Sequence, residues 1–357
     1  MMRDYKIVFK GIFSHQSMTE KQYGGTSSFG VKDKFAPNNM KNNAGLDKTN
    51  SAKYVPDKDY QELSEDVIED LKKAGKIASE TVRFAKGFIK KDMSLLEIAE
   101  KIEAKIFELG GKPAFPVNLS INEVAAHSTP SYNDSSLAYG LLKVDIGVHI
   151  QGHIADTAFS IDLENLEENK KLIESAESAL KEAVEVFSLT TSLGKIGKII
   201  EDKIKSFGFQ PVSNLSGHSI EQYNLHSGVT IPNYDNSREK YLENGVYAVE
   251  PFATSGLGAV KDGKPSGIYH IEKEGSVRDS FARTVLQFIK DEYKTLPFCT
   301  RWIYKKFGAR GLIAMKRIEE ASLLHSHHQL IETGKGKVAQ AEHTIILTGN
   351  EKIITTL

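Results

Sequence analysis

The sequence predicts an α+β protein made of two related halves, in which helices back antiparallel sheet and a helical subdomain is inserted. Three observations support this fold class: a hairpin pattern that begins at Lys143, an internal repeat at shifts of 98 to 105 residues, and two helical patterns inside the second copy of the hairpin. The chain has 357 residues, which is enough to bury one large core or two smaller ones.

Composition excludes several classes of function. The 46 Lys and Arg residues balance the 47 Asp and Glu residues, so the chain has no basic footprint for nucleic acid or for a membrane surface. A single cysteine, Cys299, cannot form a disulfide framework and suits a reducing compartment. No apolar run approaches the ~18 residues that a membrane span needs. We therefore expect a cytoplasmic protein with no membrane partner and no specific nucleic-acid partner.

The beginning of the chain differs from the rest. Residues 1–58 contain ten Lys and Arg against five Asp and Glu, and they are rich in Asn, Gly and Ser. Such a composition cannot bury enough apolar surface to offset the entropy that is lost on ordering. We expect residues 1–60 to be a disordered or poorly ordered extension and residues 61–357 to form the folded domain.

Two amphipathic helices are expected to open this domain. Ser64 is a favoured N-cap residue, and it precedes apolar residues at helical spacing over residues 67–89. Residues 94–97, Ser-Leu-Leu-Glu, match the capping box that begins a helix. The glycines at 110–111 match the C-terminus of that second helix.

A β-hairpin pattern carries the first two candidate site residues. In KVDIGVHIQGHIADTAFSID, apolar residues occupy alternate positions of the first arm, as in a half-buried strand. A two-residue turn at 151–152 places Asp145 opposite Ala158 and Asp156 opposite Gly147. Both carboxylates then lie on one face as diagonal neighbours, roughly 7–8 Å apart at Cα. Two like charges this close require compensation.

The same arrangement recurs further along the chain. At a shift of 98 residues the apolar positions of the second helix and its terminal glycine repeat, and ADTAFSI is similar to AEHTIIL. Because polar residues recur in register together with the helix pattern, we infer an internal duplication. The recurring polar pairs are His127 and His226, Asp145 and Glu250, and Asp156 and Glu342.

The second hairpin is interrupted by an insertion. Glu250 and Glu342 are ninety-two residues apart, whereas their counterparts in the first hairpin are eleven apart, so the insertion occupies about residues 260–335. DSFARTVLQFIKDEY and GLIAMKRIEEASLL have helical patterns and predict a helical subdomain there. The histidines at 325–328 suggest a metal cluster, but this run lacks a matching partner motif, and we expect a surface turn.

Two hairpins packed face to face would bring four carboxylates into one cleft. Asp145, Asp156, Glu250 and Glu342 cannot all stay ionised there without cations. A centre of two divalent ions resolves this, because bridging carboxylates hold two ions about 3.5–4 Å apart and an imidazole completes the ligands of one. His218 in NLSGHSI is the best candidate imidazole. Such an oxygen-rich site accepts manganese, iron, cobalt or zinc.

These residues resemble the methionine aminopeptidases, which belong to the pita-bread family together with Xaa-Pro peptidases and creatinases. The resemblance extends from about residue 62 to the C-terminus and includes AFPVNLSINEVAAH and NLSGHSIEQYNLHSG. The insertion and LPFCTRW resemble the type II subclass of archaea and eukaryotes, whereas residues 1–58 match nothing that we recognise. The five residues that match the family's metal ligands are Asp145, Asp156, His218, Glu250 and Glu342.

The resemblance implies a pita-bread fold and removal of the N-terminal methionine from nascent polypeptides whose second residue is small. Two divalent ions would activate the attacking water, and Glu250 would act as general base and then as proton donor. His127 and His226 would hydrogen-bond the scissile amide and the tetrahedral intermediate. The residues placed at the methionine pocket are Phe115 and Leu225, with His270 nearby.

Two other functions stay open from the sequence. One is a Xaa-Pro aminopeptidase or dipeptidase of the same fold, against which the type II insertion argues. The other is a non-catalytic relative that binds ribosomes or other proteins, against which the complete ligand set argues. We expect a monomer whose partners are the N-termini of nascent polypeptides, and association with the ribosome stays open.

Overall fold

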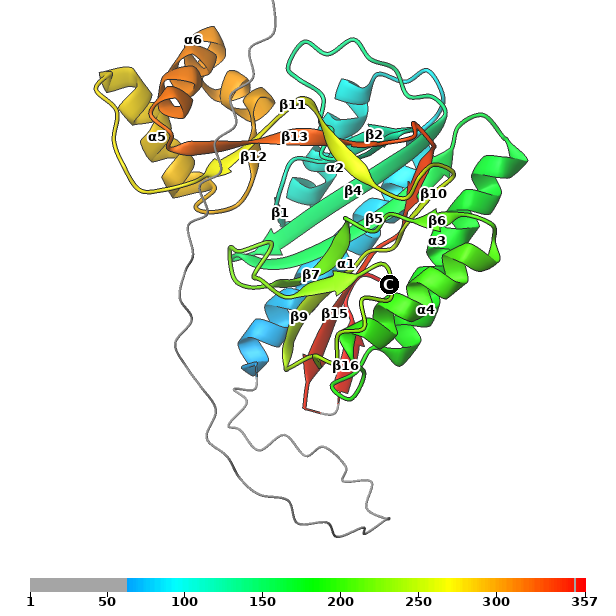
Figure 1. The fold of residues 1–357 in the computed structure, drawn as a ribbon. Coiled ribbons are helices and arrows are strands. Elements are labelled where there is room, and N and C mark those ends of the chain that lie inside the picture. The colour runs from blue at the N-terminus through cyan, green and yellow to red at the C-terminus, as the bar shows by residue number, and fades with distance from the viewer. Residues whose placement is uncertain (1–62, 350) are drawn as a thin grey trace, which may run out of the picture. The chain divides into compact units, whose positions relative to one another are not determined.

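The computed structural model describes residues 63–349 and 351–357, and the extension expected at residues 1–60 lies outside them. The described residues mix helices with antiparallel sheets, as expected for the α+β class (Figure 1). Within these residues no helix combines the length and the apolar character that a bilayer crossing requires.

The first half begins with two helices and ends with a long hairpin. Strand β4 pairs with β5 over its whole length and also with β1 and β2. The elements in chain order are α1 (Glu65–Phe88), α2 (Leu95–Glu108), β1 (Lys112–Pro113), β2 (Asn118–Ile121), β3 (Val124–Ala126), β4 (Leu141–Ile150) and β5 (His153–Asp162).

The predicted register of the first hairpin is confirmed. Asp145 pairs with Ala158, and Gly147 pairs with Asp156. Residues 151–152 form the turn with φ angles of 52° and 89°. Positive φ at both central positions is the requirement of the two-residue type I′ turn, whose twist matches that of the strands.

The second half repeats this order. Its elements before the insertion are α3 (Glu167–Val186), α4 (Leu193–Ser206), β6 (Gln210–Pro211), β7 (Ser216–Ile220), β8 (Thr230–Pro232), β9 (Gly245–Val249) and β10 (Phe252–Thr254). After the insertion come β14 (Val338–Gln340), β15 (His343–Thr348) and β16 (Glu351–Ile354). The five strands β16-β15-β9-β7-β8 form one sheet in that order.

Local details show that the duplication is real. Ser94 Oγ accepts a hydrogen bond from the N–H of Glu97 at the start of α2, and the residue 98 positions later, Ser192, does the same at the start of α4. The glycines that follow the two helices have φ angles of 85° and 84°. Ser64 is the N-cap residue of α1 as predicted, although its side chain makes no capping hydrogen bond there.

The insertion contains both predicted helices, and it also contains three strands. Its elements are β11 (Val260–Ile271), α5 (Ser280–Glu292), β12 (Phe298–Cys299), α6 (Thr300–Glu320) and β13 (Leu324–Glu332). β13 pairs with β11 on one side and with β3 of the first half on the other. The surface turn expected at residues 325–328 is therefore wrong, because these histidines lie in β13.

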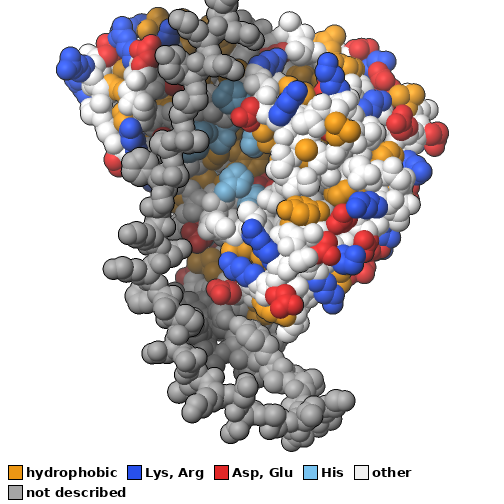
Figure 2. Space-filling view, viewed as in Figure 1, with side chains coloured by type: hydrophobic (Ala, Val, Ile, Leu, Met, Phe, Trp, Pro, Cys, Tyr) orange, Lys and Arg blue, Asp and Glu red, His pale blue; other side chains and the backbone are white. Residues whose placement is uncertain are grey.

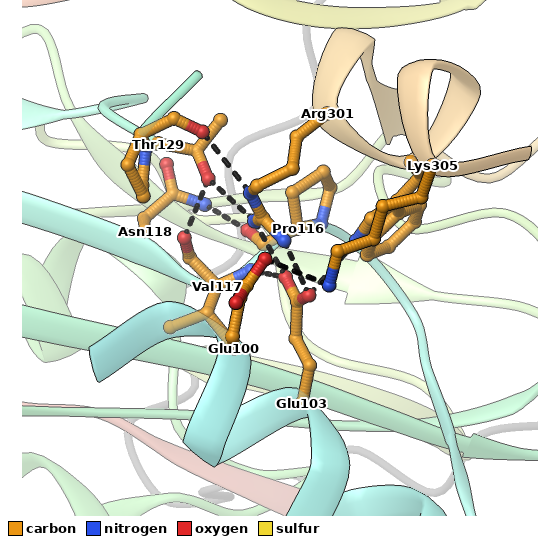
Figure 3. A network of polar contacts seen from close by, with 10 residues as sticks. Glu100, Glu103, Pro116, Val117, Asn118, Thr129, Arg301 and Lys305 are labelled. Carbon is orange, nitrogen blue, oxygen red and sulfur yellow. Dashed lines mark hydrogen bonds and ion pairs between the residues drawn. The ribbon is translucent and has the colours of Figure 1, made fainter. Parts of the chain in front are cut away.

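A buried ion pair joins the insertion to the first half (Figure 3). Arg301 of α6 donates two hydrogen bonds, of 2.6 and 2.8 Å, to the carboxylate of Glu103 on α2. The same guanidinium reaches Thr129 and the carbonyl of Pro130. The carboxylate in turn accepts from Trp302 and from the N–H of Val117. This network anchors the segment that leads from α2 into β2 and β3.

Candidate active site

The four predicted carboxylates meet where the two halves touch. Asp156 lies in β5 and Glu342 directly precedes β15. The N–H of Asp156 donates to Thr344 Oγ1 (2.7 Å), which donates back to the Asp156 carbonyl (2.8 Å). The N–H of Glu342 donates to the carbonyl of Ala158 in β5 (3.1 Å). These hydrogen bonds hold the two carboxylates side by side although they come from different hairpins.

His218 on β7 completes the group. Its Nε2 atom lies 3.8 Å from Asp156 Oδ2 and 3.7 Å from Glu250 Oε1. Asp156, His218 and Glu342 each offer a ligand atom within 4.8 Å of the others, and all three side chains are buried. Asp145 joins the set from β4 and shares a hydrogen-bond donor, Gln340 Nε2, with Glu250.

The carboxylates are buried without enough hydrogen-bond donors. Burial raises the pKa of Asp145 to about 7, with hydrogen bonds from neighbours opposing the rise. Burial, and after it repulsion from the neighbouring carboxylates, raises the pKa of Asp156, Glu250 and Glu342 well above the ordinary range. Four of their buried oxygens have no hydrogen-bond partner: Asp145 Oδ1, Asp156 Oδ1 and both oxygens of Glu342.

This donor set fits divalent metal ions. Leaving ionised carboxylates buried and unpaired costs several kcal/mol per group, and cations remove that cost. Carboxylate oxygens with one imidazole are the ligands that manganese, iron, cobalt and zinc accept. Burial and the neighbouring His226 lower the pKa of His218 to about 3, so its imidazole is neutral near pH 7, which is the form that binds metal.

Gln340 is a functional candidate that the sequence did not reveal. Its Nε2 atom donates to Asp145 Oδ2 and to Glu250 Oε2, both at 3.3 Å, and so bridges the two halves. Ser160 fixes the Gln340 backbone through two hydrogen bonds. One sequence feature points to this role: Gln340 lies two residues before Glu342, and alternate residues of an extended segment face the same side.

A cavity of about 310 Å³ opens beside this group. Phe115 and Leu225, the predicted pocket residues, both line it, and the walls are mainly apolar. Phe115 can approach β4 because Gly147 has no side chain: an added Cβ would lie 2.2 Å from the ring. Figure 2 shows histidine side chains gathered in the hollow beside the insertion.

Three histidines border the cavity next to the carboxylates. Besides the candidate ligand His218, the two predicted substrate histidines, His127 and His226, line it, and so does His327 of β13. The backbone of His127 is in the left-handed region, at φ 56°. The rings of His127 and His327 have centroids 5.4 Å apart and meet edge to face. Strand β13 therefore helps to position His127.

His270 lies one layer behind this wall. It is not among the residues that line the cavity, but its Nδ1 atom is 2.8 Å from Nε2 of His327, which does line it. The sequence predicts a turn at 325–328 because this run has no partner motif nearby in the chain. The partner is His270 on the neighbouring strand, where residues 270 and 325 are directly paired.

Comparison with known proteins identifies the family. The model of metallopeptidase family M24 matches residues 69–286. The methionine aminopeptidase of Pyrococcus abyssi is 45% identical over 294 residues, which cover 81% of this chain and 99% of that protein. The chain belongs to the M24 family, with the archaeal methionine aminopeptidases. The methionine aminopeptidase of Methanocaldococcus jannaschii is 42% identical and covers 81% of this chain and 98% of its own length.

A solved structure agrees with the M24 fold. The crystal structure of the methionine aminopeptidase from Thermotoga maritima has a TM-score of 0.61, at 21% identity, and covers 83% of this chain and 99% of that one. The expected pita-bread fold and the resemblance to archaeal-type enzymes are thus confirmed. Members of the M24 family are metallopeptidases, which agrees with a group of side chains that fits divalent cations.

Proposed function

We propose that this protein is a methionine aminopeptidase that removes the N-terminal methionine from polypeptides whose second residue is small. One observation carries the proposal: four buried carboxylate oxygens without hydrogen-bond partners lie beside an apolar cavity in an M24 chain. The unpartnered carboxylate oxygens require a cationic cofactor, and the apolar cavity suits an apolar substrate side chain. The similarity to archaeal methionine aminopeptidases supports the same activity.

Five residues would hold two divalent ions. We assign this role to Asp145, Asp156, His218, Glu250 and Glu342. Divalent ions in such a site supply Lewis acidity and an activated water for hydrolysis of the scissile amide. Manganese, iron, cobalt and zinc all suit these ligands.

Glu250 and two histidines would carry the proton and hydrogen-bond steps. The side chain of Glu250 is 13% exposed and lines the cavity, so its carboxylate would contact both the ligand group and a substrate bound there. It would accept the proton from the attacking water and return it to the leaving amine. Burial, with His127 and His270 nearby, lowers the pKa of His226 to about 4. A neutral His226, with His127, would hydrogen-bond the scissile amide and the developing oxyanion.

Phe115 and Leu225 would contact the methionine side chain. A thioether is flexible and polarizable, so it adapts to an apolar cavity and contacts aromatic rings favourably. His270 would act indirectly through its hydrogen bond to His327, which lines the wall. The substrates would be N-termini of nascent polypeptides, and the cytoplasm, where these are made, would be the place of action.

The decisive experiment compares peptides on the manganese-loaded protein. We expect Met-Ala-Ser to be cleaved far faster than Leu-Ala-Ser, because one misplaced methylene in an apolar pocket costs about 1–3 kcal/mol. Met-Arg-Ser should be nearly inert if the cleft excludes a large second residue. A protein that cleaves Ala-Pro but not Met-Ala-Ser is instead a Xaa-Pro enzyme, and a protein that binds metal but cleaves neither is a non-catalytic relative.

The extension should be dispensable for chemistry. We propose that residues 1–60 are an accessory segment and that residues 61–357 form the catalytic domain, with the insertion at about 260–335. Deleting residues 1–58 should leave hydrolysis of Met-Ala-Ser and metal content unchanged. If turnover persists but co-sedimentation with ribosomes is lost, the segment, with ten basic and five acidic residues, is a docking arm. Loss of the fold would contradict this boundary.

A further inference from the structure

Three histidines and a glutamate form a second cluster on the two long strands of the insertion. His270 lies in β11, Glu272 directly follows that strand, and His325 and His327 lie in β13. His270 and His325 are directly opposite each other in the antiparallel ladder. Because strand side chains alternate, Glu272 shares a face with His270, and His327 shares that face with His325. The cluster runs from the cavity wall at His327 outward to the surface.

Two imidazoles face the same carboxylate oxygen. His270 Nε2 and His325 Nδ1 each lie 3.6 Å from Glu272 Oε2. In a tetrahedral zinc site with bonds of about 2.0–2.1 Å, ligand atoms are about 3.3–3.4 Å apart, so two edges are close to the required length. Among the described residues only Asp156, His218 and Glu342 already bring three ligand atoms within 4.8 Å. As placed, the two histidine nitrogens and the Glu272 oxygen do not all lie within 4.8 Å of one another, so the third edge requires a rotation of His325, whose side chain is 52% exposed.

His327 orients the inner imidazole of the cluster. The bond between His270 Nδ1 and His327 Nε2, 2.8 Å long, leaves His270 Nε2 directed at Glu272. Metal-binding histidines generally make such a hydrogen bond with their second ring nitrogen, which fixes the tautomer and the ring orientation. When His270 donates its Nδ1–H to His327, its Nε2 lone pair faces the carboxylate, and a cation between them satisfies both acceptors.

The charges of the cluster also favour a cation. His270 Nδ1 is engaged with His327, so a neutral His270 that donates there has only the Nε2 lone pair to offer toward Glu272. Within the described residues the ion pairs of Glu272 are the two with His270 and His325, and it pairs with no lysine or arginine. Neutral imidazoles with one carboxylate are the ligands that zinc, nickel and copper prefer.

We propose that His270, Glu272 and His325 bind a transition-metal ion of the zinc type at the rim of the cavity, separately from the five-residue centre. His327 is the positioning residue of this rim site. An ion there would hold β11 and β13 together and would fix His327 as part of the cavity wall. The proposal does not depend on which peptide the enzyme cleaves.

Metal counting tests the rim site directly. The full-length untagged protein is equilibrated with Zn²⁺, passed through a desalting column and measured by plasma mass spectrometry. We expect the wild type to retain one more zinc per chain than His325→Ala or Glu272→Gln. His153→Ala is the matched control, since His153 is a partly exposed histidine on β5 outside the cluster, and it should retain as much zinc as the wild type. Equal zinc in His325→Ala and the wild type would overturn the proposal.

Repeating the comparison in an Asp156→Asn background separates the two sites. Adding His325→Ala to Asp156→Asn should still remove one zinc per chain, and the absence of that loss would assign the extra zinc to the main centre and refute the rim site. His325→Ala alone should keep manganese-supported hydrolysis of Met-Ala-Ser. If the wild type fails to cleave that peptide while the zinc difference persists, the proposed function fails and the rim site stands.

Discussion

The two hairpins of the duplicated fold carry equivalent carboxylates but are closed differently. In the first, β4 and β5 form one uninterrupted ladder with a two-residue turn. In the second, β9 pairs with β15 and β10 with β14 in a single register, but the ladder is broken at Glu250 and Glu342. Pro251, which has no N–H to donate, lies at this break. The insertion occupies the place of the turn.

This difference separates the chemistry of the site from its walls. At the break, the N–H of Glu342 bonds to Ala158 of the first hairpin, so the interruption is where the halves are joined. The insertion that follows contributes Ile268, Pro297, His327 and Leu330 to the cavity. The duplicated strands thus provide the carboxylates, and the insertion, which departs from the symmetry, provides part of the cavity wall.

The largest expected effect tests whether both hairpins contribute equally. Asp156→Ala and Glu342→Ala occupy equivalent positions, and each should lower kcat/KM for Met-Ala-Ser by more than about 100-fold and reduce bound manganese, because altering residues that merely support a ligand already costs 10–100-fold. Asp202→Ala, an exposed aspartate of α4, is the control. Full activity in either variant would show that the two carboxylates are not equivalent and would contradict the assignment of two metal ions.

The link between the insertion and the first half should dominate stability. Arg301→Met leaves the Glu103 carboxylate buried without its charged partner, and it should lower the free energy of unfolding by about 3–5 kcal/mol in a denaturant titration. Lys305→Met removes an exposed pair with Glu100 and should cost about 0–1 kcal/mol. Adding Glu103→Leu to Arg301→Met should recover part of the lost stability. If the losses of the two single variants simply add in the double variant, Arg301 and Glu103 do not stabilise each other.

Gln340 tests the bridge between the two hairpins. Gln340→Ala removes the amide that donates to Asp145 and Glu250, and it should lower manganese affinity or kcat by about 10–100-fold without loss of fold. Gln329→Ala, which removes a side-chain bond to Ser128 outside the carboxylate group, serves as the control. Unchanged manganese affinity and unchanged kcat in Gln340→Ala would show that the bridge is not needed.

A glycine in the first hairpin occupies the position that a phenylalanine has in the second, and this difference can be tested. Gly147 corresponds to Phe252 at the shift of 105, and only the glycine leaves room for Phe115. Gly147→Ala should displace that ring, raise KM for Met-Ala-Ser and cost about 1–3 kcal/mol of stability through overpacking. Gly87→Ala in α1 meets no atom within 4 Å and should be neutral or stabilising. An unchanged KM in Gly147→Ala would remove Phe115 from the substrate pocket.

The smallest effect is the pH dependence of the metal-free protein. The raised pKa of Asp145, about 7, means that the folded state holds protons between pH 6.5 and 8 that the unfolded state has lost, so stability falls as pH rises. Buried histidines such as His218 have lowered pKa values and oppose this trend, most strongly where the unfolded imidazole is still protonated, near and below about pH 6.5. The raised pKa values of Asp156, Glu250 and Glu342 act in the same direction as that of Asp145 and outweigh them. Melting temperatures of EDTA-treated protein at pH 6.5 and 8.0 should show the fall, and added manganese should reduce it. A metal-free protein that becomes more stable from pH 6.5 to pH 8.0 would contradict the raised pKa values of the buried carboxyl groups.

Much of the site was accessible from the sequence because its residues belong to regular local patterns. Alternation in the first hairpin determines which residues oppose each other, so it predicts the positions of Asp145 and Asp156. The repeat then transferred the same positions to Glu250 and Glu342. Gln340 and His327 escaped this reasoning, since their roles depend on which strand lies alongside them.

The sequence by itself therefore determined the two-half fold, the hairpin register and the residues that could bind metal, because strand and helix periods act over neighbouring residues. Only the tertiary structure decided that Gln340 donates to Asp145, 195 residues away, and that the histidines of β13 meet His270 rather than solvent. Such contacts depend on which faces pack and on how an insertion folds back onto a sheet. Those choices follow from burial and hydrogen bonding of the whole chain, which no local period encodes.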